Sequence, residues 1–283
     1  MATVITSIGS KSAVGDPVNG QMTMTGSSGS GTPWTGTLSV SSAPTASAGD
    51  MLFFDNVYYN CGGFGGGCSG PADIIYLITA VSGTTLTIKY ISGGANSDPI
   101  NLKANSMGSS NAQPYVLRYY STPTTWDAGL DDTGLYSSGD TAKGECYDDS
   151  DFSITAGITV DGGGTVGLDT VILSVPVGQR HDGTAKEVGG SGVRFLWAAP
   201  GNNARSQIGL KIDEAREAWV EWIDFDVNGY GLHSGGMVAA LQLHGGQYYT
   251  AGYANGAAWC IVHDNTGQPV SYTHLTLPTI YSV

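Results

Sequence analysis

An alternating stretch in the second half constrains the fold of this chain more than any other feature. From Ile223 to Asn228, apolar side chains alternate with Asp and Asn side chains. This period of two predicts a β-strand with one apolar face and one acidic face directed to solvent. Similar segments return at Val238–His244 and Trp259–Asn265. A strand and corner pattern that returns along a chain is typical of a solenoid.

The composition favours strands over helices. The 283 residues include 43 glycines, and only 12% of residues are charged. Long runs rich in Glu, Lys and Ala are absent from the sequence, whereas Ser, Thr and Gly are dense, which suits short strands and tight turns. Hydrophobic residues make up 41% of the chain, enough for a core. We therefore expect an all-β protein.

The net charge argues against a nucleic-acid partner, and the distribution of apolar residues argues against a membrane span or a secretory signal. The net charge is −13 with only 11 Lys and Arg residues, so no basic stripe is present to bind a nucleic acid. No segment has the apolar length of a membrane span, and the N-terminus lacks the basic start and apolar core of a secretory signal. Either the protein stays inside the cell or it leaves by a route that needs no signal. We expect a virion component released by lysis or an extracellular protein; a missing true start would also account for the absent signal.

The chain divides into four parts in this interpretation. Residues 1–120 form a small antiparallel barrel or sandwich, with strands at 51–59, 74–81, 84–91 and 115–120. Residues 121–143 are a linker with a short helix at Thr124–Asp132, in which Trp126 and Leu130 share one side. Residues 144–269 are a truncated right-handed parallel β-helix, and 270–283 are a non-native tail.

The β-helix prediction depends on the spacing of short apolar runs. Ile223 and Leu241 are 18 residues apart, and Leu241 and Ile261 are 20 apart. We interpret each spacing as one coil of a three-sided parallel β-helix, whose coils stack about 4.8 Å apart. A β-sandwich is the competing fold because it also uses many short strands. The corner at 229–236 is too long for a hairpin and favours the β-helix.

Four motifs carry a resemblance to a known fold family. They are Gly144–Tyr147, Gly178–Gly183, Trp219–Gly229 and Ile261–Asn265. With them, residues 126–267 resemble the N-terminal coils of right-handed parallel β-helix proteins, as in pectate-lyase-like enzymes and phage tail spikes. The resemblance implies a polysaccharide or cell-surface glycan as partner and, by analogy with tail spikes, a homotrimer.

The last residues read differently from the rest. The string VSYTHLTLPT at 270–279 resembles a translated sequencing adapter, so the gene fragment would end near Pro269. A genuine final strand is the alternative, since Leu275, Leu277 and Ile280 have strand character. If the tail is an artefact, the β-helix is cut within its stack.

The candidate catalytic and ligand-binding residues are acidic and aromatic. Asp224 and Asp226 point the same way from one strand, about 7 Å apart by strand rise, as general acid and base or calcium ligands would. A solvated outer face is the alternative, because alternation alone predicts it. The remaining candidate ligand-binding residues are Asn228 and Asp264 for an acidic patch, and Trp222, Tyr230, Tyr248, Tyr249 and Tyr253 for stacking on sugars.

The cysteines and one corner complete the candidates. A disulfide between Cys61 and Cys68 would close a short glycine loop and contribute about 2 kcal/mol, and two free thiols are the alternative. Cys146 and Cys260 are expected to behave as small buried hydrophobes. The run Arg180-His181-Asp182 is expected to form a hydrogen-bonded corner, with an ion pair and a titratable imidazole as the alternative. No metal site is expected.

Three functions remain open at this point. The first is a structural protein of phage fibre or tail-spike type that binds a receptor or glycan, without catalysis or cofactor. The second is a polysaccharide lyase or glycoside hydrolase with a site near Asp224 and Asp226. The third is a surface adhesin whose corners are stiffened by Ca²⁺.

Overall fold

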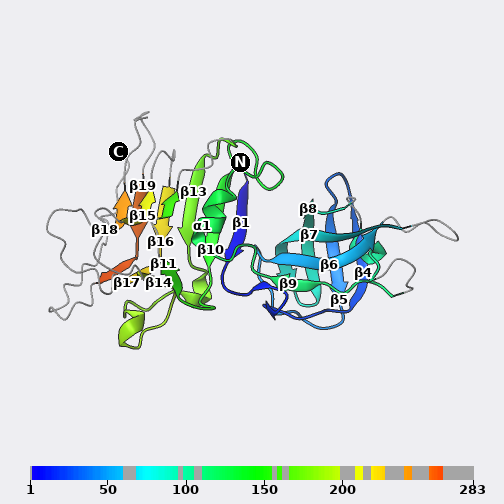
Figure 1. The fold of residues 1–283 in the computed structure, drawn as a ribbon, viewed down its shortest axis with the longest axis horizontal. Coiled ribbons are helices and arrows are strands. Elements are labelled where there is room, and N and C mark those ends of the chain that lie inside the picture. The colour runs from blue at the N-terminus through cyan, green and yellow to red at the C-terminus, as the bar shows by residue number, and fades with distance from the viewer. Residues whose placement is uncertain are drawn as a thin grey trace. The chain divides into compact units, whose positions relative to one another are not determined.

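The computed structural model describes residues 2–59, 68–94, 98–104, 110–154, 158–160, 166–197, 208–212, 218–226, 239–243 and 255–263. Strands dominate these residues (Figure 1), which confirms the prediction of an all-β chain. The chain separates into two compact units, one formed by Ile5–Ser121 and the other by Met1–Val4 with Thr122–Val283. No helix among the described residues is long and apolar enough to cross a membrane.

The first unit is built on a six-stranded antiparallel sheet in the order β4-β5-β8-β7-β6-β9. The strands β4 and β9 stand at the two ends of this order, so the sheet is open, and the barrel, one of the two folds predicted for residues 1–120, is not confirmed. The strands are β2 (Ser12–Ala13), β3 (Asp16–Pro17), β4 (Met24–Ser30), β5 (Thr35–Val40), β6 (Met51–Tyr59), β7 (Ser69–Ser82), β8 (Thr85–Ser92) and β9 (Tyr115–Leu117), with one 3-10 helix, η1 (Pro99–Asn101).

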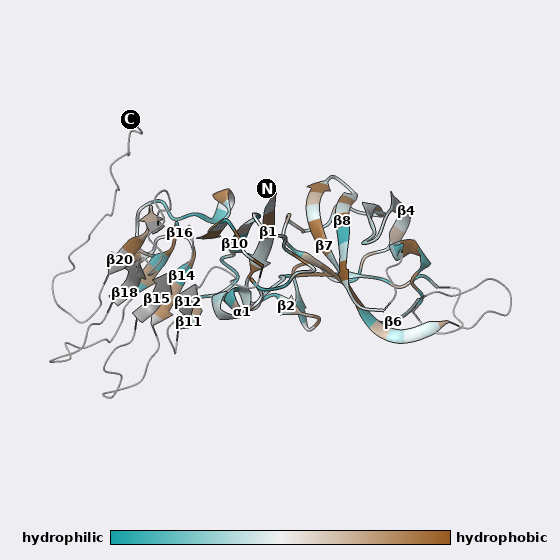
Figure 2. Ribbon diagram, turned by 90° about the horizontal axis from the view of Figure 1, so that it is seen from above, coloured by the Kyte–Doolittle hydropathy of each residue, from teal (hydrophilic) through white to brown (hydrophobic). Residues whose placement is uncertain are grey.

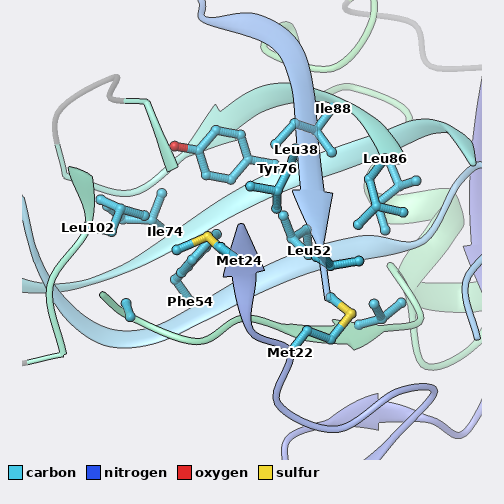
Figure 3. Packing of buried hydrophobic residues seen from close by; sticks show 14 of the residues in the cluster. Met22, Met24, Leu38, Leu52, Phe54, Ile74, Tyr76, Leu86, Ile88 and Leu102 are labelled. Carbon is cyan, nitrogen blue, oxygen red and sulfur yellow. The ribbon is translucent and has the colours of Figure 1, made fainter. Parts of the chain in front are cut away.

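Aromatic side chains organise the core of this unit. Tyr76 is fully buried and meets Trp34, Phe54 and Tyr90 edge to face, with ring centres 5.7–6.0 Å apart. Figure 3 shows Tyr76 and Phe54 among the aliphatic side chains of neighbouring strands. Edge-to-face pairs of this kind add about 0.5–1.5 kcal/mol each beyond the area they bury.

The hairpin between β7 and β8 forms as the sequence predicts. Ser82 pairs with Thr85, and Gly83 in the turn has φ +56, a conformation that glycine adopts without steric strain. Leu86 and Ile88 are fully buried while Thr87 between them is exposed. The polar and apolar bands along β7 and β8 follow this alternation (Figure 2).

Three sheets form the second unit, with strand orders β1-β10-β13-β16-β19, β11-β14-β17-β20 and β12-β15-β18, and their strands from β10 to β20 pair in parallel; β1 includes residues of both units. Their strands are β1 (Thr3–Ile8), β10 (Thr141–Cys146), β11 (Phe152–Ile154), β12 (Ile158–Val160), β13 (Thr170–Ser174), β14 (Arg194–Trp197), β15 (Ile208–Ile212), β16 (Ala218–Glu221), β17 (Asp224–Asp226), β18 (Ala239–Leu243), β19 (Asn255–Ala258) and β20 (Ile261–His263). Two 3-10 helices, η2 (Val177–Gln179) and η3 (Lys186–Val188), lie between β13 and β14.

Each pass of the chain places one strand in each sheet. The strands β10, β11 and β12 belong to three different sheets, and β13, β14 and β15 pair with them in parallel. The pairings of β16, β17 and β18 repeat this pattern. Parallel pairing differs from the antiparallel pairing of the sandwich that the sequence also allowed.

One detail of the sequence prediction is wrong here, and another is incomplete. Asp224 pairs with Ile261, 37 positions later, and Arg194 pairs with Asp224, 30 positions later. The spacings of 18 and 20 residues therefore count the distance between different sheets, not one full pass. The strand predicted from Ile223 to Asn228 is also preceded closely by another, because Trp222 has φ 63 and turns the chain from β16 into β17.

Phenylalanines from successive passes pack in a column. Phe152, Phe195 and Phe225 occupy one register position of β11, β14 and β17. Their rings meet edge to face with centres 5.4 and 5.6 Å apart, and all three side chains are buried. This column fixes the register of the sheet, since a slip of one residue would exchange its faces.

The helix α1 (Pro123–Ala128) begins earlier and ends sooner than the predicted 124–132 segment. Thr122 is the N-cap, and its hydroxyl accepts a hydrogen bond from the Thr125 backbone N–H at 3.1 Å. Trp126 and Leu130 are fully buried, as their shared side predicts. Proline at the first helical position and the capping box of the two threonines explain the start.

Candidate functional site

Two tryptophans occupy the same corner on successive passes of the second unit. Glu221 at the end of β16 pairs with Ala258 at the end of β19, so Trp222 and Trp259 follow at equivalent positions. Their φ angles are 63 and 53. Positive φ is unfavourable for a bulky side chain and costs about 1–3 kcal/mol, and such strain concentrates at functional sites. The repetition of this strain on two passes marks the corner as a candidate site.

The two indoles are stacked on each other. Their ring centres are 5.1 Å apart and their planes differ by 12°. Trp222 is half-buried, whereas 55% of Trp259 is exposed. The guanidinium carbon of Arg180 lies 4.7 Å from the Trp222 ring centre. We call Arg180, Trp222 and Trp259 the corner stack; it presents an exposed aromatic surface beside a cation.

The segment between β13 and β14 positions Arg180. The Arg180 Nε donates a hydrogen bond to the Val175 carbonyl oxygen at 3.1 Å. The next residue, His181, is buried with its ring centre 5.5 Å from that of Trp222. His181 Nδ1 accepts a hydrogen bond from the Gly183 N–H at 3.2 Å, so a neutral imidazole carries its proton on Nε2.

The third residue of this run bonds to its own turn. Asp182 Oδ1 accepts a hydrogen bond from the Thr184 N–H at 2.9 Å, and this bond lowers the pKa of the Asp182 carboxyl. The local bond agrees with the predicted hydrogen-bonded corner. The contact of Arg180 with Trp222 joins residues 42 positions apart, so local spacing in the sequence did not reveal it.

The structure corrects the prediction that Asp224 and Asp226 face solvent. The two residues are 0% and 1% exposed. The backbone N–H of Lys186 in η3 donates to Asp224 Oδ2 at 2.8 Å, and Arg194 Nη1 donates to Asp226 Oδ2 at 3.2 Å. The segment between β13 and β14 thus supplies a backbone donor, and strand β14 supplies a cation, and these partners allow the carboxylates to be buried.

These contacts extend into an ion network. Lys186 forms ion pairs with Asp148 and Asp151, at 3.0 Å to the latter, and Arg194 bonds both Asp151 and Asp226. Desolvation raises the pKa of Asp151, but the bonds from Arg194 and Lys186 outweigh it, so the pKa lies below the ordinary value. The cations of this network were missed in the sequence because they come from other passes of the chain.

Polar residues also lie on one face of the five-stranded sheet. Glu145, Ser174 and Glu221 occupy one register position of β10, β13 and β16. Ser174 Oγ donates to Glu221 Oε2 at 3.0 Å, and Lys143 Nζ donates to Glu145 Oε1 at 2.7 Å. Each carboxylate therefore has a local partner that orients it.

Several predicted site residues lie outside the described part of the chain. They are Asn228, Tyr230, Tyr248, Tyr249, Tyr253, Asp264 and Cys61, together with the 270–283 tail. Cys68 is disulfide-bonded. Cys146 and Cys260 are buried free thiols, as expected, and desolvation raises the pKa of Cys260 to about 11. The described residues hold no group of three His, Cys, Asp or Glu side chains placed to bind a metal ion.

Comparisons with known proteins give no relative for this chain: no family model matches it, and no curated protein or solved structure does.

Proposed function

We propose that this chain is a structural protein of phage fibre or tail-spike type that binds a glycan through the corner stack. In this proposal the second unit is a stretch of right-handed parallel β-helix. The three parallel sheets support it, since each receives one strand per pass. Right-handed crossovers between parallel strands are the general rule and support the handedness.

The observation that carries the proposed function is the stacked, strained and exposed pair of Trp222 and Trp259. A large exposed aromatic side chain next to polar residues offers an apolar face to a ligand while its neighbours bond hydroxyl groups. Stacking on Trp222 holds the Trp259 ring in place, which lowers the entropy lost on binding. A saccharide ring, with apolar C–H faces and a polar rim, fits such a surface.

The acidic pair favours binding over cleavage. Glycoside hydrolysis needs two carboxyl groups beside the substrate, one of which accepts or donates a proton. Asp224 and Asp226 are buried, and their contacts with Lys186 and Arg194 leave them as parts of the fold. The enzyme alternative would therefore require other residues.

Glycan binding is tested with the full chain on a polysaccharide array, followed by titration monitored by tryptophan fluorescence. Trp259→Ala should weaken binding by about 1–2 kcal/mol, roughly fivefold to thirtyfold. Val188→Ala is the matched control because Val188 is 63% exposed in the same unit and outside the corner stack. The proposal fails if Trp259→Ala and Val188→Ala bind alike. New reducing ends in the bound polysaccharide would instead indicate an enzyme.

Self-association belongs to the same proposal. Tail-spike proteins are usually trimers, so the resemblance implies a homotrimer for this chain, located on the virion or outside the cell. Sedimentation equilibrium of the full chain measures this directly. A monomer at micromolar concentration would remove the trimer from the proposal and leave glycan binding untouched.

A further inference from the structure

We infer that the corner stack selects an anionic saccharide, with Arg180 as the group that binds the carboxylate or sulfate. The inference rests on the proposed function, since it names the ligand class of the same site. The evidence is a comparison of the described cations of the second unit and of the carboxylates that pair with them.

Arg180 differs from the other described cations of this unit. Lys143 pairs with Glu145, Lys186 with two aspartates, and Arg194 also with two aspartates. Arg180 is the one Lys or Arg side chain described in Thr122–Val283 that forms no ion pair with a carboxylate of the described residues. The nearest acid in sequence, Asp182, bonds the backbone of its own turn.

The contacts of Arg180 orient its guanidinium for a ligand. The Nε bond to Val175 and the Trp222 ring hold the group, and the residue remains half-buried rather than covered. The two Nη groups donate to no described residue. A planar guanidinium with two donors side by side matches a carboxylate or sulfate bidentately, and stacking on an indole reduces the freedom lost when the bond forms.

The charge of the whole chain makes this cation decisive for selectivity. The net charge of −13 repels an acidic polymer at long range, so such a ligand binds only where a local cation offsets the repulsion. Lys186 and Arg194 are already neutralised by aspartates. Neutral glycans would gain the aromatic contact alone, whereas an anionic glycan would also gain a charge-assisted bond.

The test uses the full chain and immobilised hyaluronate, alginate and polygalacturonate, each beside its carboxyl-reduced, neutral form. Wild-type protein should bind at least one acidic polymer roughly tenfold more tightly than its neutral form, which is what one charge-assisted bond supplies. Arg180→Gln should lose this preference and keep the weaker binding to the neutral form. Lys143→Gln removes the same charge at an ion-paired site and should retain the preference.

The outcomes separate this inference from the proposed function. Equal binding of acidic and neutral forms by the wild type, or an unchanged preference in Arg180→Gln, overturns the inference while glycan binding stands. Absence of binding to these polymers, with binding to other glycans on the array, also overturns the inference alone, whereas absence of binding to the whole array overturns both. If Arg180→Gln fails to fold, the salt dependence of the wild type decides: preference for the acidic form should vanish at high NaCl, and persistence would refute the inference.

Discussion

Replacing Arg194 by methionine should destabilise the second unit because it leaves Asp226 buried without its cation. The Asp226 side chain is 0% exposed and the Arg194 side chain 18%, with Nη1 and Oδ2 3.2 Å apart. Breaking a buried ion pair by removing one partner costs about 3–5 kcal/mol. Arg194 is partly exposed, and Lys186 remains beside Asp151 when Arg194 is replaced. We therefore expect the loss in the free energy of unfolding to lie near the lower limit, about 3 kcal/mol.

Lys143→Met is the matched control for this change. The Lys143–Glu145 pair is 2.7 Å long, and its side chains are 22% and 13% exposed. A pair on an accessible face is worth less, and we expect a loss below about 1 kcal/mol. The difference between the two variants, about 2 kcal/mol, therefore measures what burial of the Asp226 carboxylate adds.

Urea unfolding followed by tryptophan fluorescence measures both variants. Five of the six tryptophans lie in the second unit, so their emission reports mainly on it. Asp226→Asn should restore part of the stability lost in Arg194→Met, because it removes the buried charge that Arg194 paired with. Equal stability of the Arg194→Met and Lys143→Met variants would refute the structural role of the pair. Loss of polysaccharide cleavage in Asp226→Asn with normal stability would return Asp226 to the catalytic role first predicted.

Three further predictions concern the pH dependence of stability and the helix start. The pKa of Asp151 is lowered in the fold, so its contribution to stability is present above the ordinary value of 3.8 and is lost as the pH falls through the lower folded value. Acid titration of the second unit should show this loss, and Arg194→Met should reduce its slope. The pH dependence due to Asp50 in the first unit has the opposite sign, because desolvation raises the pKa of its carboxyl despite the Arg118 guanidinium 2.8 Å away. The stability that Asp50 contributes is therefore lost as the pH rises through the raised pKa, and Asp50→Asn should flatten this dependence. Thr122→Ala should lower the free energy of unfolding, measured by thermal denaturation, by about 1 kcal/mol because it removes the N-cap of α1. Thr124→Ala is the control, since Thr124 is exposed and outside the cap, and it should cost less. Equal losses in the two variants would contradict the role of the cap.

Local patterns in the sequence predicted the strands of the first unit well. The segment Met51–Tyr59 is a strand over its full predicted length, and the turn at Gly83 lies where the sequence places it. Both depend on nearest neighbours along the chain, which a single sequence displays. Closure of the sheet depends instead on which strands meet at its edges, and the open order from β4 to β9 was beyond such patterns.

The second unit shows where local reasoning fails. Alternation correctly separates Phe225 from Asp224 and Asp226, since the phenylalanine joins the interior column. The partners on the opposite face are not encoded in that alternation, because they come from an earlier pass: Lys186 from η3 and Arg194 from the neighbouring strand β14. A polar face on a strand predicts water only if nothing else in the chain can hydrogen-bond to it.

The corner stack was predicted only in part for the same physical reason. Trp222 was a candidate because it is aromatic, but Trp259 was not, although the register places the two at equivalent positions 37 residues apart. One pass between the two tryptophans is 37 residues long. The spacings of 18 and 20 residues taken from the sequence are about half of that length, so they did not pair Trp222 with Trp259. Passes of unequal length hide the repeat, since loops between strands vary while the stacking register stays fixed. Contacts between passes, such as Arg180 on Trp222, therefore have to be read from the fold.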